Sequence, residues 1–274
     1  TYSALDDQAL VFGNLQANVT YTFSAVDANG CSVNIPPRTL GQPLPLQATA
    51  NLQSIVCFGG TGGISLQITG GTKPYTIEWS YSPDNSAFSV VPTHADKTSI
   101  SGLVAGFYRY KISDGGCADI IETVELAQPP QVILAAVPTD VSCFGGNDGT
   151  ITFSPSGGAF STYRIFFNGQ EIAGNTVTGL TAGVYNAFAM NGTCRSDVIQ
   201  IVIAQPAAPL SATVTYLDEV PCFGDVSDIG LKITGGNGGY RAFLNGTEFP
   251  VPVSGDLTFP DVAPGSYTIR VVDS

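Results

Sequence analysis

Apolar and polar residues alternate in several short runs along the chain, which is the pattern of half-buried β-strands. Residues 64–68 (Ile-Ser-Leu-Gln-Ile) and 124–126 show it, as do residues 75–79, 163–167 and 240–244, which each begin with tyrosine. No window longer than about ten residues places apolar side chains at the 3.6-residue period of a helix. The sequence therefore predicts an all-β protein with nearly no helix.

Two sets of motifs repeat along the chain. Cys-Phe-Gly occurs at residues 57–59, 143–145 and 222–224, and a Gly-Gly pair follows each of them. A tyrosine with Asp or Asn six residues later recurs out of phase with the first motif, at Tyr21, Tyr108, Tyr185 and Tyr267. A period of about 80 residues is too long for a solenoid coil and suits small independent domains.

The spacing of the predicted strands indicates the fold of each repeat. Six or seven short strands within about 80 residues are typical of an immunoglobulin-like β-sandwich. Such a sandwich keeps a corner tyrosine whose hydroxyl bonds back to the preceding turn, and we interpret the four recurring tyrosines in this way. The predicted fold is an array of tandem immunoglobulin-like β-sandwich modules in a head-to-tail rod.

Proline-rich segments at residues 42–45, 128–130 and 205–209 are predicted to be short, semi-rigid linkers. The predicted domains are the C-terminal half of a truncated repeat (1–42), two immunoglobulin-like repeats (43–128 and 129–206), and a repeat truncated before its last strand (207–274). The pattern predicts Gly-Cys after Ser274, so we expect both ends to be cuts within a longer repetitive protein.

The charge and cysteine content narrow the class of protein. With 22 acidic and 10 basic residues the net charge is -12, which argues against a nucleic-acid partner because phosphate binding needs clustered Lys and Arg. No run approaches the ~18 to 20 apolar residues of a membrane span, so no membrane insertion is expected. Six cysteines at recurring positions indicate an oxidising compartment, and we expect an extracellular or cell-surface location.

The cysteines allow three patterns of pairing. Sequence neighbours could bond (Cys31 with Cys57, Cys117 with Cys143, Cys194 with Cys222), which requires the chain to fold back at each proline linker. Cysteines within a repeat could bond (Cys57 with Cys117, Cys143 with Cys194), although bridged α-carbons must lie within ~7 Å. The third pattern joins one module to the next, as Cys57 with Cys194, and would stiffen the joint. The sequence leaves all three open.

The sequence contains no recognisable catalytic motif. The single histidine, His94, lies in a polar stretch, and the cysteines recur in every repeat as structural residues do. We therefore predict that the chain is not an enzyme. Calcium is the one cofactor to consider, and the weak candidates on acidic turns are Asp27, Asn29, Asn147, Asp148, Asp225 and Asp228. The alternative is that these side chains bond their own turns.

The longest loop is the candidate ligand site. Residues 80–97 fill a passage that is shorter in the third repeat, and the loop carries Tyr81, Asp84, Asn85 and Phe88. The alternative is a neutral insertion or an extra edge hairpin. Trp79 could stack on a sugar, but it holds the strand position of Phe167 and Leu244 in the other repeats, which predicts a place in the core.

Taken together, the motifs resemble the SprB-type repeat of Bacteroidota surface proteins over nearly the whole chain. They are Cys-Phe-Gly-Gly-Asn-Asp-Gly at 143–149, the Gly-Gly pair before a tyrosine strand, the Leu-x-x-Gly-x-Tyr turn and the Asp-x-x-Gly-Cys hairpin. The chain departs from the pattern at residues 225–228 and at Met190-Asn191, where Asp is expected. That family includes giant gliding-motility adhesins exported by the type IX secretion system.

The resemblance implies a segment of a long secreted cell-surface adhesin or filament, whose repeats act as a stalk and make weak multivalent contacts. The implied partners are neighbouring repeats, polysaccharide or abiotic surfaces, and secretion and attachment machinery acting through other regions. Two alternatives remain open. The repeats could be accessory modules of a secreted enzyme, or subunits of a self-assembling filament whose incomplete ends are completed by strands of neighbours.

Overall fold

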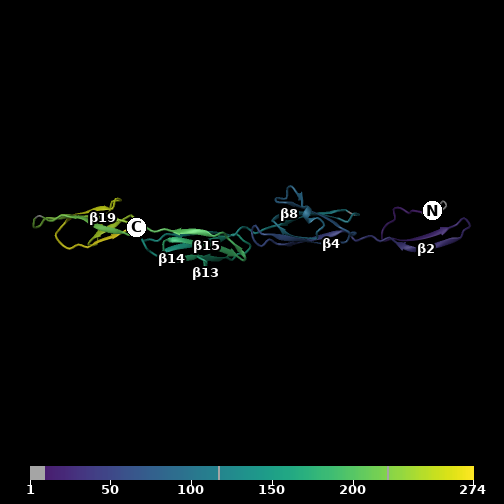
Figure 1. The fold of residues 1–274 in the computed structure, drawn as a ribbon, viewed down its shortest axis with the longest axis horizontal. Coiled ribbons are helices and arrows are strands. Elements are labelled where there is room, and N and C mark those ends of the chain that lie inside the picture. The colour runs from purple at the N-terminus through teal and green to yellow at the C-terminus, as the bar shows by residue number, and fades with distance from the viewer. Residues whose placement is uncertain (1–9, 117, 221) are drawn as a thin grey trace. The chain divides into compact units, whose positions relative to one another are not determined.

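The computed structural model describes residues 10–116, 118–220 and 222–274, and within them β-strands account for nearly all regular structure (Figure 1). The all-β prediction is confirmed. The chain divides into two compact units, one made of Thr1–Ile55 with Gly59–Ala127 and the other of Val56–Phe58 with Gln128–Ser274. The domain boundaries expected from the sequence stay a prediction.

Among its described residues, the first unit contains a hairpin and a two-sheet sandwich. The hairpin pairs β1 (Thr20–Val26) with β2 (Ser32–Thr39). One sheet has the order β3-β4-β7, with bounds Gln47–Gln53, Gly62–Thr69 and Ser99–Leu103. The other has the order β6-β5-β8-β9, with bounds Ser89–Val90, Thr76–Ser82, Gly106–Ser113 and Ile120–Leu126. A 3-10 turn, η1 (Pro92–His94), lies between β6 and β7.

The second unit contains four sheets, which form two sandwiches. One sheet of the first sandwich has the order β10-β11-β14, with bounds Ile133–Thr139, Gly149–Ser156 and Thr176–Leu180. The other sheet is built around β15 (Gly183–Asn191), which pairs with β12 (Arg164–Phe167), β16 (Cys194–Arg195) and β17 (Ile199–Ile203). Strand β13 (Gln170–Ile172) pairs with β12 at the edge of this sheet. The other sandwich has β18-β19-β22 (Ser211–Leu217, Ser227–Thr234, Asp256–Val262) and β21-β20-β23 (Thr247–Pro250, Arg241–Leu244, Ile269–Val272).

Alternation along the strands builds one apolar core inside each sandwich. In β8, every second residue from Gly106 to Ile112 is buried, because successive side chains point to opposite faces of a strand. The core of the first unit joins Trp79 and Tyr110 of one sheet to Ile64 of the other. In the second unit, Phe153 and Phe259 are fully buried in separate cores. Trp79 is only 1% exposed, so its predicted place in the core is confirmed.

The four recurring tyrosines bond back to the turns that precede them. The hydroxyls of Tyr108, Tyr185 and Tyr267 donate to carbonyl oxygens four residues earlier, at 3.0, 2.8 and 2.9 Å, and that of Tyr21 donates to Gln16 O at 3.2 Å. Burial raises the pKa of Tyr108 to about 12, so its hydroxyl keeps the proton that it donates. The bond ties each turn to the start of the following strand.

Candidate functional site

A disulfide in the second unit joins cysteines from two successive repeats. Cys57 is the cysteine of the first Cys-Phe-Gly motif. It is bonded to Cys194, and the two α-carbons lie 5.4 Å apart. Cys194 is buried at the start of β16, its sulfur lying 3.2 Å from the carbonyl oxygen of Val56, and Cys57 packs against the core of which Cys194 is part. For Cys57, this is the third of the three pairings and it excludes the other two.

The hairpin that carries Cys194 is held by a buried amide. Asn191, at the end of β15, is 0% exposed. Its Oδ1 accepts hydrogen bonds from the backbone N–H groups of Ala159 and Phe160, both at 2.9 Å. Its Nδ2 donates to the carbonyl oxygens of Phe160 and Thr162, at 2.7 and 2.9 Å. An aspartate could make the first pair of bonds but not the second, because a carboxylate has no donor. The two bonds that Nδ2 donates therefore explain why asparagine, and not aspartate, fits this position.

The Gly-Gly turn packs against both the hairpin and the linker. Gly157 has φ +78°, and a Cβ on it would lie 1.8 Å from Gln131 O. Gly158 donates its N–H to Pro130 O at 2.9 Å, and a Cβ on it would lie 2.2 Å from Asn191 Oδ1. Only glycine fits either position, because the chain approaches too closely for a side chain. The turn thus ties the proline linker to the cysteine hairpin.

The same lock occurs in the other sandwiches. The equivalent groups are Gly70–Gly71 with Leu44, Pro45 and Asp114, and Gly235–Gly236 with Ala208, Pro209 and Asp273. A tyrosine after each turn donates its hydroxyl to the first glycine's carbonyl oxygen, from Tyr75, Tyr163 and Tyr240 at 2.5, 2.6 and 2.7 Å. Reasoning from sequence placed these tyrosines on strands but missed this role, whose signal is a tyrosine five or six residues after the glycine.

The candidate ligand loop forms an extra edge strand with its own internal bonds. Tyr81 lies in β5, its ring packs on Tyr108 with centroids 5.0 Å apart, and its hydroxyl donates to Ala105 O at 3.0 Å. Asp84 Oδ1 accepts from the side chains of Ser82 and Ser86, and the bonds from Ser86 lower the pKa of Asp84. Through its contacts with Tyr108 and Ala105, Tyr81 supports the corner of the sandwich.

Asp84 is exposed, and the other two loop candidates follow it in the chain. Asn85 is exposed at the tip with φ 63°, a conformation that asparagine tolerates. The half-buried ring of Phe88 lies under Arg109, whose guanidinium carbon is 3.7 Å from the ring centroid. The structure thus does not gather the four candidates around one cleft.

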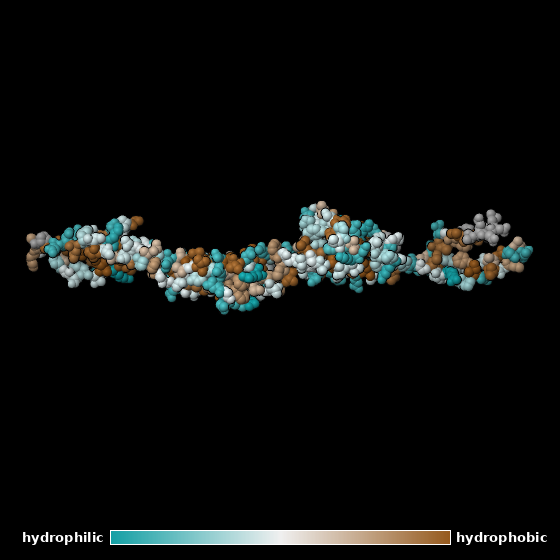
Figure 2. Space-filling view, in the orientation of Figure 1, coloured by the Kyte–Doolittle hydropathy of each residue, from teal (hydrophilic) through white to brown (hydrophobic). Residues whose placement is uncertain are grey.

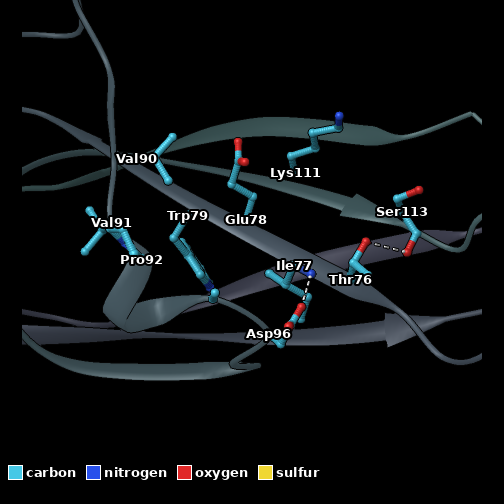
Figure 3. A pocket seen from close by; sticks show the side chains of 11 residues that line it. Thr76, Ile77, Glu78, Trp79, Val90, Val91, Pro92, Asp96, Lys111 and Ser113 are labelled. Carbon is cyan, nitrogen blue, oxygen red and sulfur yellow. Dashed lines mark hydrogen bonds between the residues drawn. The ribbon is translucent and has the colours of Figure 1, made fainter.

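A shallow hollow of about 530 Å³ lies beside this loop (Figure 3). Strand β5 supplies Glu78 on one side, and Val90 and Pro92 border another. Asp96, which follows η1, accepts from Ile77 N at 2.9 Å and so fixes the loop to β5. Trp79 borders the hollow, but its indole N–H donates to Lys97 O at 3.0 Å, so its polar edge is occupied.

Comparison with known families identifies the repeat. Residues 49–82 and 135–164 match the family described as the SprB repeat. These two segments, which together make up less than half of the chain, are similar to the SprB repeat. Cys57 lies in the first matched segment and Cys143 in the second, so the Cys-Phe-Gly cysteine belongs to the repeat itself. The resemblance drawn from the motifs is confirmed. No curated protein sequence matches the chain.

Solved structures with tandem immunoglobulin-like domains also match, at low scores. A tetra-tandem repeat from the extending region of a large adhesion protein is 11% identical, with a TM-score of 0.29 over 92% of this chain and 77% of that one. The Dpr2 Ig1-Ig2 complex with DIP-Theta Ig1-Ig3 is 14% identical, with a TM-score of 0.32 over 85% and 95%. For a Dscam structure the values are 12%, 0.30, 65% and 51%, so this chain spans about half of its length.

The calcium candidates lie on separate turns, and several of their oxygens already accept backbone N–H groups. Asp27 Oδ1 accepts from Asn29 and Cys31, Asp148 Oδ1 from Ser142, and Asp228 Oδ1 from Asp261. Asp225 donates its N–H to Cys222 O within a turn, and Asn147 adjoins Asp148. Across the described residues, no three His, Cys, Asp or Glu side chains group as a metal site. Calcium binding stays a prediction.

Cys31, Cys143 and Cys222 are free and exposed, and Cys117 lies outside the described residues. Hydrophobic residues, shown in brown, reach the surface along the whole described part of the chain (Figure 2). Among them are the phenylalanines after three of these cysteines, since Phe58, Phe144 and Phe223 are 52%, 44% and 109% exposed. In the part of the chain that the structure describes, no helix could span a membrane.

Proposed function

We propose that the chain is a stalk segment of a long, secreted, repetitive cell-surface adhesin, in which the SprB repeats act as spacers and make weak contacts. The observation that carries the proposal is the Cys57–Cys194 bond, which joins the Cys-Phe-Gly loop of one repeat to the hairpin cysteine of the next. A covalent link between repeats serves a chain that transmits force, whereas an independent binding module gains nothing from being bonded to its neighbour. Disulfides also persist where the surroundings are oxidising, which supports a location outside the cell.

The lock around each Gly-Gly turn supports the same proposal. It fixes linker, turn and hairpin together through bonds that recur in three sandwiches. Spacing elements need defined geometry at their joints, and the repeated use of glycines with no room for a side chain supplies it. Gliding motility, export by the type IX secretion system and an origin in Bacteroidota are further proposals, supported by the resemblance to the SprB repeat.

Weak contacts are proposed for the tip of the 80–97 loop, because Asn85 is exposed and Phe88 half-buried there, while Oδ1 of the exposed Asp84 already accepts hydrogen bonds within the loop. Displaying many copies on one bead raises apparent affinity by about 10² to 10⁴ without any new contact. We therefore expect single chains to show no saturable binding to a panel of polysaccharides, silica and polystyrene, while chains displayed densely on beads are retained.

The matched variants separate the loop from the rest of the surface. Replacing Asn85 and Phe88 by alanine should abolish bead retention, and Val137→Ala, at another exposed apolar position, should leave it unchanged. Each arm is run with calcium and with a chelator. Tight saturable binding by a single chain would overturn the stalk proposal in favour of an adhesive module. Absence of retention on beads would remove the weak contacts and leave a spacer.

A further inference from the structure

We propose that the outer face of the sheet β13-β12-β15-β16 binds the carboxylate groups of an acidic polysaccharide, and that Arg195 makes the contact. The outer face of β21-β20-β23 carries the equivalent site at Arg270. The inference deepens the weak contacts proposed above and rests on that proposal, but it concerns a surface separate from the 80–97 loop. The positions and the partners of the arginines carry it.

Arginines stack on phenylalanines in this acidic chain. The sequence has six arginines, and in the described residues five of their guanidinium carbons lie 3.7 to 5.6 Å from the centroid of a phenylalanine ring. A cation over an aromatic face is attracted by the ring's electron density, which holds the long side chain in place. In a chain of net charge -12, these ordered guanidinium groups are local positive sites that attract an anion. The five are Arg109, Arg164, Arg195, Arg241 and Arg270.

In the third repeat, two arginines flank a pair of stacked rings. Phe166 of β12 and Phe188 of β15 are cross-strand partners, with ring centroids 4.8 Å apart and planes 5° from parallel. The guanidinium carbon of Arg195 lies 3.8 Å from the centroid of Phe188, and that of Arg164 lies 5.2 Å from the centroid of Phe166. Ala187, the neighbour of Phe188 in β15, is buried in the core, so the stack lies on the outer face. The rings therefore hold two guanidinium groups at defined places on that face.

One of these two arginines has a carboxylate partner and the other has none. Arg164 donates from Nε and Nη2 to the two carboxylate oxygens of Glu171, at 2.9 and 2.5 Å. Among the described residues, none forms an ion pair or a hydrogen bond with the guanidinium of Arg195. The Arg164–Glu171 pair shows the two-pronged geometry that a guanidinium makes with a planar carboxylate. Arg195, held on the same stack, offers that geometry to a carboxylate from outside.

The fourth repeat has the same arrangement. Arg241 and Arg270 lie over Phe243, at 5.3 and 5.6 Å from its centroid. Arg241 donates from Nε and Nη2 to the two carboxylate oxygens of Glu248, both at 2.8 Å. In the part of the chain that the structure describes, Arg270 has no ion pair. A paired and an unpaired guanidinium on an aromatic support thus occur in two repeats, which suits a polymer that presents carboxylates at intervals.

The face fits a polysaccharide better than an acidic polypeptide or a nucleic acid. Strand β15 pairs with β12 on one side and with β16 and β17 on the other, so its main chain offers no free edge to an extended peptide. A polymer of uronic acids needs no main-chain partner, because it binds through carboxylates and ring C–H groups. A nucleic acid requires many clustered cations, which a chain of net charge -12 does not supply.

The test is a nuclear magnetic resonance titration of the oxidised chain with a galacturonic acid trimer, with a chelator present, read on the arginine Nε–H signals. The matched control is the galactose trimer with the same linkage, which lacks the carboxylates. We expect the signals of Arg195 and Arg270 to shift with the acidic trimer, and those of Arg164 and Arg241 to shift severalfold less because Glu171 and Glu248 hold them. Arg38, which lies over no ring among the described residues, reports general screening and should not shift.

Two variants separate the site from general charge. Phe188→Leu removes the ring beneath Arg195, and should reduce the shift of Arg195 severalfold while leaving that of Arg270 unchanged. Glu171→Gln removes the internal carboxylate, and should raise the shift of Arg164 towards that of Arg195. Unchanged backbone signals of the fourth repeat show that each variant has folded.

Three results would overturn the proposal. They are equal shifts at all six arginines, equal shifts with sulfate at the same ionic strength, and larger shifts with a glutamate trimer, which would make an acidic peptide the ligand. The titration also fails separately from the proposed function. Absence of arginine shifts removes this site and leaves bead retention through the loop, whereas loss of bead retention removes the loop contacts and leaves the arginine shifts.

Discussion

Reducing the disulfide should lengthen the fully extended chain by about 450 to 490 Å in a force–extension experiment. The bond separates Cys57 from Cys194 by 137 residues, and an extended chain spans about 3.3 to 3.6 Å per residue. While the bond is intact, pulling on the two ends cannot extend those residues, even after both sandwiches unfold. The Cys57–Cys194 bond thus shields most of the second and third repeats from force.

The size of this change identifies the pairing. A bond between Cys31 and Cys57 would hide 26 residues (57 minus 31) and a change of only about 90 Å. A bond between Cys57 and Cys117 would hide 60 residues (117 minus 57), about 200 Å. Cys57→Ser should give the long extension without reductant, whereas Cys222→Ser, at a free and exposed cysteine, should leave the extension unchanged. Equal lengths in oxidised and reduced chains would contradict the assignment.

Asn191→Asp should destabilise the third repeat by about 2 to 3 kcal/mol at neutral pH. The buried amide donates to Phe160 O and Thr162 O, and a carboxylate would leave both carbonyl oxygens without a donor while adding a buried charge. The free energy of unfolding is measured by denaturant titration with the disulfide intact. The matched control is Asp273→Asn at the equivalent position of the fourth repeat, where an amide oxygen can still accept from Asn237 N, and little change is expected.

The loss in Asn191→Asp should depend on pH in a defined direction. Burial would raise the folded-state pKa of the new carboxyl above its unfolded value of about 3.9. Stability is then greatest below the unfolded pKa, where the protonated carboxyl can donate one bond, and falls as the pH rises through the folded pKa. A variant as stable as the parent at neutral pH, or one that becomes more stable as the pH rises, would show that the amide donor is not needed.

The strands and cores could be predicted from the sequence because they depend on local alternation. Residues 64–68 lie within β4, and residues 75–79 overlap the start of β5. Trp79 is buried, as its equivalence to Phe167 and Leu244 predicts. The corner tyrosines follow from the same logic, since a tyrosine bonding four residues back is a short-range feature.

The joint could not be predicted from the sequence because it depends on contacts between distant segments. All three cysteine pairings were compatible with the spacing, and only the packing of Cys57 against the core around Cys194 decides between them. In the sequence, Asn191 departs from a pattern in which Asp is expected. In the structure its Nδ2 donates to two carbonyl oxygens, which an ionised Asp could not do. Tyr81 read as a ligand residue because its hydroxyl's partner, Ala105 O, lies 24 residues away.

Disulfide mapping of the oxidised chain tests the central claim, that a disulfide joins the Cys-Phe-Gly loop of one repeat to the β15–β16 hairpin of the next. The chain is alkylated, digested without reduction and examined by mass spectrometry. The account predicts a peptide containing Cys57 bonded to one containing Cys194, with Cys31, Cys143 and Cys222 alkylated. Bonding of Cys57 to Cys31 or to Cys117 would contradict it, because the joint would then be closed within a repeat or between sequence neighbours.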